Sequence, residues 1–137
     1  MPGKPSKRIP LETGSLFLKQ LDALLDSLPI DITFVDRTDT VRYFNRLGKR
    51  VFARTPAVIG RKVQQCHPPK SIDKVNAILG GFRSGKRDSA EFWINMKGKM
   101  IYIRYFPMRD RKGKYIGCLE VTQDITVIKR IDGEKRL

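Results

Sequence analysis

Hydrophobic positions change their spacing along the chain and divide it into helical and strand-like parts. Residues 15–27 carry leucines and one phenylalanine at three- and four-residue intervals, which predicts an amphipathic helix with Ser15 as its N-cap. Pro29 should end this helix, because the residue before a proline disfavours helical backbone. The prolines at positions 1–14, together with their basic residues, predict a flexible arm.

In later segments, hydrophobic residues alternate between helical spacing and the two-residue spacing of strands. β-Branched and aromatic residues predict a hairpin of strands at 30–36 and 40–44. Helical spacing returns at 46–53, in a short turn at 56–59 that Pro56 opens, and in a longer helix after Ser71. Three strands are predicted at 89–96, 100–108 and 115–125. The charged tail, residues 126–137, is compatible with a helix that Gly133 weakens.

This order of elements, together with several short motifs, resembles a PAS domain. The motifs are Phe34-Val35-Asp36, Phe44-Asn45-Arg46, Ile59-Gly60-Arg61, Pro107-Met108-Arg109-Asp110 followed by Gly113 and Gly117, and Asp124-Ile125-Thr126. The run Cys66-His67-Pro68-Pro69-Lys70-Ser71 also resembles a subgroup of PAS modules that sometimes follow a hemerythrin-like region. The resemblance implies an α+β fold: a five-stranded antiparallel sheet with helices packed on one face and an N-terminal amphipathic helix.

The resemblance covers about residues 16–128 and also implies how the chain is organised. We expect a basic arm at 1–14, a sensor domain at 15–128 and a charged tail or signalling linker at 129–137. Such a module binds a small ligand or partner and transmits a conformational change, which implies sensing, signal transduction or regulation of transcription. Catalysis is not expected, because the sequence contains no nucleophile–base set, paired acids or phosphate-binding loop.

Strand alternation selects the residues expected to face a pocket. Arg104 should avoid a dry core, so Ile101, Ile103 and Tyr105 turn inward. On the last strand, hydrophobicity alone would turn Leu119 and Val121 inward, whereas the resemblance turns the alternate residues inward, and we follow the resemblance. The pocket candidates are Phe34, Tyr43, Asn45, Cys66, His67, Ile101, Ile103, Tyr105, Cys118, Glu120 and Thr122.

The choice of which alternate residues of the last strand turn inward has consequences for both faces of the sheet. A buried Glu120 needs a partner, such as Tyr43, Tyr105 or a ligand cation, unless it lies at the rim, solvated or paired with a lysine. The outer face becomes apolar, so the N-terminal helix or a second subunit must cover it, and a homodimer is expected. Interface candidates are Leu16, Phe17, Leu21, Leu24, Leu119 and Val121. Asp124 and Thr126 are expected to couple the sheet to the tail.

Residues near the pocket leave the cofactor open between haem, flavin and none. His67 is the only histidine, and the resemblance allows such a residue to hold haem iron in a redox or gas sensor, with Cys66 beside it; a loop fixed by two prolines is the structural alternative. Zinc is not supported, because four ligands at recognisable spacing are missing. For flavin, light-sensing relatives carry a reactive cysteine where this chain has Val63.

Composition adds constraints on partners and location. The 28 Lys and Arg residues exceed the 14 Asp and Glu residues, and the formal charge of +14 favours an acidic partner. The basic residues are spread along the chain without a recognition motif, so association with nucleic acid is only an alternative. Two cysteines, no apolar run of membrane length and no secretory signal predict a cytoplasmic protein.

Overall fold

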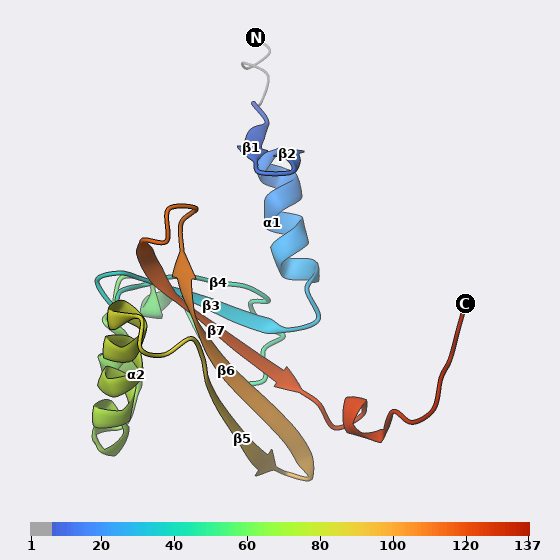
Figure 1. Ribbon diagram of the computed structural model, residues 1–137. Coiled ribbons are helices and arrows are strands. Elements are labelled where there is room, and N and C mark those ends of the chain that lie inside the picture. The colour runs from blue at the N-terminus through green and yellow to red at the C-terminus, as the bar shows by residue number, and fades with distance from the viewer. Residues whose placement is uncertain (1–6) are drawn as a thin grey trace.

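A computed structural model describes residues 7–137 and shows a five-stranded antiparallel sheet (Figure 1). The strands are β3 (Asp31–Asp36), β4 (Val41–Phe44), β5 (Ala90–Met96), β6 (Lys99–Arg109) and β7 (Tyr115–Asp124), in the spatial order β4–β3–β7–β6–β5. Pairing of β3 with β7 joins the first hairpin to the three C-terminal strands. The expected α+β architecture with this sheet is confirmed.

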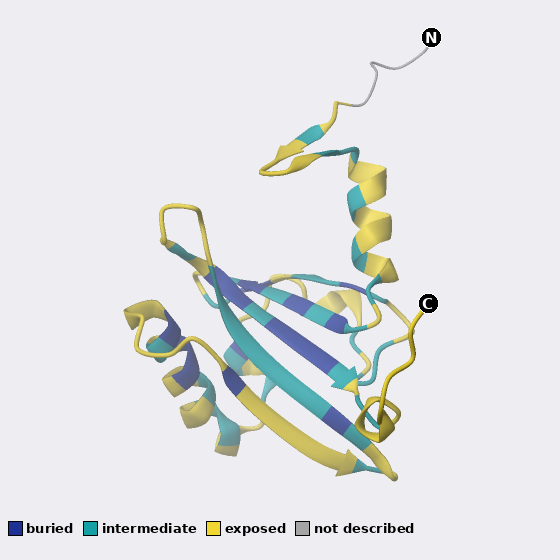
Figure 2. Cartoon of the chain, turned by 45° about the vertical axis from the view of Figure 1, so that its right-hand side comes forward, coloured by how far each residue is buried: buried dark blue, intermediate teal, exposed yellow. Residues whose placement is uncertain are grey.

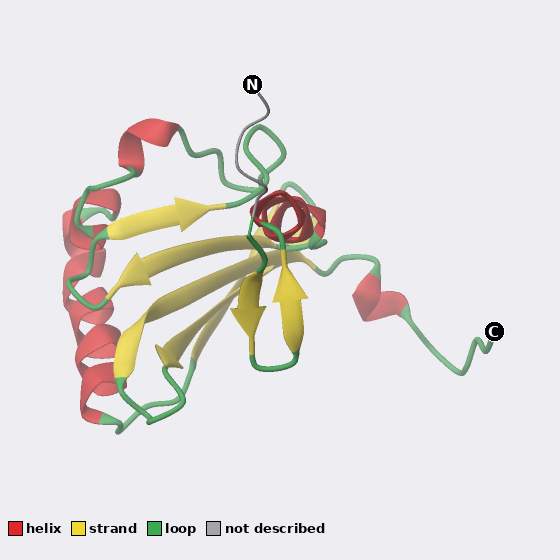
Figure 3. Ribbon diagram, turned by 90° about the horizontal axis from the view of Figure 1, so that it is seen from above, coloured by secondary structure: helices red, strands yellow, loops and turns green. Residues whose placement is uncertain are grey.

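The chain between β4 and β5 supplies the helical layer on the inner face. It contains the short helices η1 (Pro56–Val58), η2 (Val63–Cys66) and η3 (Pro69–Ser71), followed by α2 (Ile72–Ser84). Ile78, Leu79 and Phe82 of α2 are buried, and Gly85, with φ 77°, ends the helix in the left-handed conformation that glycine favours. The view from above shows α2 lying along one side of the sheet (Figure 3).

The N-terminal part differs from the expectation in its details. Within the described part of the expected arm, β1 (Ile9–Leu11) pairs with β2 (Gly14–Leu16); positions 1–6 lie outside the described residues. Helix α1 (Leu18–Ser27) therefore begins two residues later than predicted, with Phe17 instead of Ser15 at its N-cap. No residue of α1 is buried, and the helix stands clear of the sheet (Figure 1), so it leaves the outer face uncovered.

The helix predicted at residues 46–53 is not formed, and this stretch is an irregular loop. Arg46 has φ 58° and Gly48 has φ 81°, both outside the helical region. Two of the backbone amides bond to distant carboxylates: Arg46 N donates to Asp26 Oδ1, and Val51 N donates to Asp31 Oδ2. These tertiary contacts take the place of a helical ladder, which explains the failed prediction.

The tail holds only one helical turn. The short helix η4 (Ile128–Arg130) follows β7, and the residues beyond it are exposed and irregular. Gly133 has φ 65°, which is incompatible with a continuing helix. Among residues 7–137, none of the helices is both long and apolar enough to cross a membrane.

The two faces of the sheet are covered to different extents (Figure 2). On the outer face, Tyr43, Phe34, Leu119 and Phe106 lie directly opposite one another across four strands and form an apolar row. Val121, beside this row, is buried within the single chain, and Arg104 lies opposite it in the β6–β7 register. The expected apolar outer face is therefore present, and the Arg104 guanidinium lies over the Phe106 ring, 5.7 Å from its centroid.

Gly117 lets β7 approach β3 closely. Its φ is +156°, and an added β-carbon would lie 2.3 Å from the Val35 carbonyl oxygen and 2.5 Å from the Phe34 ring. We expect Gly117→Ala to lower the free energy of unfolding by about 2–4 kcal/mol, because both backbone and ring must move. Gly80→Ala, in α2 with open space around it, is the matched control and should change stability by at most about 1 kcal/mol. Urea denaturation measures both; an unchanged midpoint for Gly117→Ala would contradict the close approach.

Candidate functional site

A cavity of about 300 Å³ lies between the inner face of the sheet and the helical layer. Its wall is mostly apolar, with a few polar side chains. The apolar residues are Val35, Val63, Val75, Ile78, Leu79, Phe92 and Ile103, and the polar ones are His67, Ser71, Lys74, Tyr105, Cys118 and Glu120. An apolar cavity with a small set of polar groups is the usual form of a small-molecule site.

The strand register positions the sheet side of this wall. Tyr105 of β6 lies directly opposite Glu120 of β7, and Cys118 lies opposite Val35 of β3. Side chains of alternate residues share a face, so these residues reach the cavity while Leu119 lies on the other side. The structure thus places Cys118 and Glu120 on the cavity side of β7, the side that the family resemblance implied.

Glu120 finds its partner in Arg54. Its carboxylate is 8% exposed, and Oε2 accepts a hydrogen bond from Arg54 Nη2 at 3.2 Å. The protein partners considered from sequence, Tyr43, Tyr105 or a lysine, are not bonded to Glu120 among the described residues. Sequence reasoning missed Arg54, because it predicted a helix at 46–53 in place of the irregular loop that brings Arg54 to the cavity. A paired carboxylate is thus the buried charged group of the wall, whereas the lysine in the wall, Lys74, is exposed.

Two further polar groups face this pair in uncharged form. Burial lowers the pKa of His67, although the nearby Glu120 carboxylate acts in the opposite direction. Burial also raises the pKa of Tyr105, and the charge of Glu120 adds to the effect. At neutral pH the cavity therefore presents a neutral imidazole, a phenolic hydroxyl and a carboxylate, which together can donate and accept hydrogen bonds.

Neither cysteine is arranged as a reactive group. Cys118 lines the cavity, but burial raises the pKa of its thiol to about 12, so it stays protonated. Cys66 lies outside the cavity wall, and its thiol donates to the Lys62 carbonyl oxygen at 3.8 Å. Val63 does line the cavity. The position at which light-sensing relatives carry a cysteine thus faces the pocket, and here it has no thiol.

The structure divides the predicted pocket residues into two groups. The cavity wall contains His67, Ile103, Tyr105, Cys118 and Glu120. The remaining candidates, Phe34, Tyr43, Asn45, Cys66, Ile101 and Thr122, lie outside it. Phe34 and Tyr43 belong to the outer face, because the β3–β7 register turns Val35 inward in place of Phe34. Ile101 and Thr122 are buried on the inner side, farther along their strands from the cavity.

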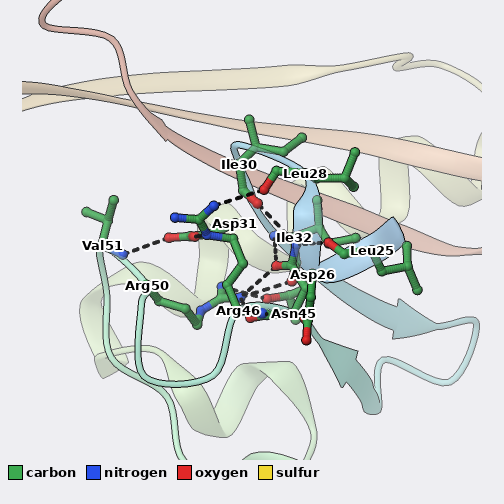
Figure 4. Close-up of polar contacts among 11 residues, drawn as sticks. Leu25, Asp26, Leu28, Ile30, Asp31, Ile32, Asn45, Arg46, Arg50 and Val51 are labelled. Atoms are coloured by element: carbon green, nitrogen blue, oxygen red, sulfur yellow. Dashed lines mark hydrogen bonds and ion pairs between the residues drawn. The ribbon is translucent and has the colours of Figure 1, made fainter. Parts of the chain in front are cut away.

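Asn45 is the centre of a polar cluster, the Asn45 junction, that joins α1, β3 and the loop after β4 (Figure 4). Its Nδ2 donates to the carbonyl oxygens of Leu25 at 2.8 Å and Ile30 at 3.1 Å. Its Oδ1 accepts from Ile32 N at 2.7 Å. Asn45 is 1% exposed, so these bonds replace water for the buried backbone groups. Its role is to connect segments, not to contact a ligand.

Arginines extend the Asn45 junction toward the cavity. Arg46 Nη1 donates to the Leu28 carbonyl oxygen at 2.9 Å, and its Nε forms an ion pair with Asp31 at 3.1 Å. Arg50 donates to the carbonyl oxygens of Ile32 and Asn45, each at 3.0 Å. Arg54, which follows Arg50 in the same irregular loop, pairs with Glu120. One loop therefore links the end of α1 to the cavity wall.

At the other end of the site, Thr126 fastens the end of β7 to β6. Its hydroxyl donates to Asp124 Oδ1 at 2.5 Å and accepts from Met100 N at 2.9 Å. The hydrogen bonds that the Thr126 hydroxyl and backbone amide donate to Asp124 lower the pKa of its carboxyl group. The predicted signalling residues Asp124 and Thr126 are thus bonded to each other where the sheet meets the tail.

Haem does not fit this cavity. A volume of about 300 Å³ is at the lower end of the range for drug-sized ligands, and a porphyrin with its propionates is larger than these. His67 faces the cavity, but Cys66 does not. Among residues 7–137, no group of three or more His, Cys, Asp or Glu side chains gathers at a spacing suited to a metal ion.

Comparison with known proteins agrees with this architecture. A family model described as PAS domain matches residues 21–126. The chain belongs to the PAS domain family. As a PAS domain, it is a module of the sensory and signalling class. No curated protein matches it.

Solved structures similar to this PAS domain extend the comparison. The C-terminal domain of a protein from Streptococcus mutans is 36% identical, with a TM-score of 0.86, and the alignment covers 94% of this chain and 100% of that one. A PAS domain from Colwellia psychrerythraea is 18% identical, with a TM-score of 0.58, over 80% and 98% of the two chains. The PAS domain of BvgS from Bordetella pertussis is 19% identical, with a TM-score of 0.56, over 80% and 86%.

Removing the Asn45 side chain should destabilise the domain strongly. Asn45→Ala would leave the Ile32 amide and two carbonyl oxygens without partners in a buried place, at a cost of about 2–4 kcal/mol in the free energy of unfolding. Asn76→Ala is the control, because Asn76 is exposed and accepts only one side-chain hydrogen bond, from Gln64 at 3.1 Å; it should change stability by less than about 0.5 kcal/mol. Equal effects in chemical denaturation would contradict the assigned role.

Burial of the Cys118 thiol predicts a loss of stability at alkaline pH. Its pKa is about 12 when folded and 9.0 as the ordinary value, so the unfolded chain gives up this proton first. The contribution of Cys118 to stability is complete below pH 9 and declines as the pH rises toward 12, by at most about 1.4 kcal/mol per pH unit. Denaturation curves between pH 8.5 and 10 should show a shallower decline for Cys118→Ala than for the unchanged protein. Parallel declines would show that this thiol does not titrate as its burial requires.

Proposed function

We propose that this PAS domain senses a small molecule bound in the cavity and passes the effect of binding to the chain segments at both ends. The observation that carries the proposal is that Glu120, Tyr105 and His67 all line one mostly apolar cavity. The module acts without catalysis, since the thiol in the wall is protonated and no activated nucleophile accompanies it.

The route toward the N-terminus runs through side chains. Glu120 holds Arg54, and the same loop contributes Arg50 and Asn45 to the junction with α1. A ligand that bonds to Glu120 competes with Arg54 or reinforces its position, and either effect acts on the loop. Ligand binding can shift the domain from one conformation to another only as far as the ligand's affinities for the two conformations differ. The two conformations here differ in the contact of Arg54 with Glu120, so Arg54 is the group at which the difference in affinity arises.

The route toward the C-terminus runs along β7. Glu120 and Asp124 belong to the same strand, and the Asp124–Thr126 turn holds the start of the tail against Met100. A shift of β7 that follows ligand binding would therefore be passed to the tail. The formal charge of +14 favours an acidic effector at its end, including one that regulates transcription.

The outer face supports a homodimer as part of the same proposal. The apolar row of Tyr43, Phe34, Leu119 and Phe106 is left uncovered by α1, and Leu24 of that helix is 48% exposed. Leu16, Phe17 and Leu21 are half-buried and belong to the same proposed interface. A second copy of the chain would cover this apolar row, and the α1 helices of the two copies would be covered as well. The two free cysteines, Cys66 and Cys118, are consistent with a cytoplasmic location for the dimer.

A bound molecule and its effect on α1 can be measured together. Protein purified under native conditions and then denatured should release a small molecule in near-stoichiometric amount, identified by mass spectrometry. Returning this molecule to stripped protein should slow hydrogen exchange at the Ile32 and Arg46 amides, because both are donors in the junction. Absence of any released molecule, or exchange changes limited to the cavity wall, would contradict sensing or its transmission, respectively.

Two variants of α1 separate binding from transmission. Asp26→Ala removes the acceptor of the Arg46 amide, so it should keep ligand binding and lose the exchange response at Arg46. Asp22→Ala, one turn earlier in α1 and exposed, should keep both. A response at Arg46 that persists in Asp26→Ala would show that the signal reaches α1 by another route.

A further inference from the structure

The cavity wall contains more polar atoms than the protein has partners for. Glu120 is 8% exposed, and a carboxylate has about four acceptor positions, yet only Oε2 has a partner, Arg54 Nη2. Within residues 7–137, no hydrogen bond reaches Glu120 Oε1, the Tyr105 hydroxyl or a ring nitrogen of His67. Glu120 is buried, Tyr105 and His67 are half-buried, and all three line the cavity, so these unpaired polar atoms are available to a bound molecule.

We propose that the ligand is a small neutral molecule with an apolar ring body and, along one edge, an N–H or O–H donor for Glu120 next to an acceptor for the Tyr105 hydroxyl. This inference rests on the proposed sensing function and specifies the class of its ligand. Tyr105 and Glu120 lie directly opposite each other on neighbouring strands and both line the cavity, so one edge of a ligand can serve both side chains. Lactams, amides and hydroxylated carbonyl compounds carry such a pair.

The charges around the cavity favour a neutral ligand. Glu120 of β7 and Arg54 of the loop already form a buried pair, and Lys74 of α2 is exposed at the wall. A cation bound in the cavity would meet Arg54, and an anion would meet Glu120, whereas water screens the charge of the exposed Lys74. Burying an ion without a free counter-ion is costly. His67 contributes no charge because burial lowers its pKa.

The rest of the wall selects a ring of limited size. The rings of Phe92 and Tyr105 meet edge to face, with centroids 6.1 Å apart at 74°, and present an aromatic surface beside the polar edge. Opposite them, α2 contributes Val75, Ile78 and Leu79. A volume of about 300 Å³ accommodates one or two fused rings more readily than larger ligands.

Calorimetric titration with 2-quinolone tests the class, because this bicyclic lactam carries the N–H and the carbonyl oxygen on adjacent atoms. Its N-methyl derivative keeps the ring and lacks the donor, and 2-naphthoate and 2-naphthylmethylammonium supply the two charges. We expect 2-quinolone to bind at least about tenfold more tightly than the N-methyl derivative, since a hydrogen bond to a carboxylate is lost. Both charged compounds should bind still more weakly.

Tyr105→Phe should weaken the binding of 2-quinolone about tenfold, because it removes only the hydroxyl. Tyr102→Phe is the matched control: Tyr102 lies on the same strand but on the outer face, where its hydroxyl donates to Glu91, and the affinity should not change. Near-equal affinity for the N-methyl derivative, tighter binding of a charged compound, or no binding of 2-quinolone would overturn the ligand class. A charged or donor-free molecule released from native protein would overturn the class and leave the sensing function standing, whereas release of no molecule counts against sensing itself.

Discussion

The antiparallel pairing of β3 with β7 is the constraint on which the structure depends. These strands come from opposite ends of the domain, and their register turns Val35, Cys118 and Glu120 to the same side. The close approach requires a residue without a β-carbon at Gly117. Without this pairing the hairpin β3–β4 and the three C-terminal strands would be separate sheets, and the cavity would have no continuous wall.

The buried pair of Glu120 and Arg54 is better explained by function than by stability. Removing two charges from water offsets most of their attraction, and apolar residues of similar size often stabilise a fold equally well. The pair does something that leucines could not: it places a charged acceptor in the cavity and ties it to the loop that enters the Asn45 junction. Ligand chemistry and the position of α1 therefore depend on one contact.

Much of the sheet was predictable because strand periodicity is a local property of the sequence. The runs at 30–36 and 115–125 are rich in β-branched residues. Alternation along 100–108 predicted Ile103 and Tyr105 on the cavity side, and the family resemblance, against hydrophobicity alone, predicted Glu120 there; all three line the cavity. The loop at 46–53 was not predictable, because carboxylates of Asp26 and Asp31, about twenty residues earlier, take its amides. Phe34 was misplaced for a related reason: its face is set by pairing with β7, which no local pattern reveals.

The two partners of the ion pair differ in how firmly the backbone holds them, and this difference gives the signal a direction. Glu120 is fixed in a strand paired on both sides, whereas Arg54 belongs to an irregular segment. A ligand that changes the pair therefore moves Arg54 more readily than Glu120, since displacing β7 breaks two ladders of hydrogen bonds. The larger displacement should then reach the Asn45 junction and α1, and the Asp124–Thr126 turn should receive the smaller one.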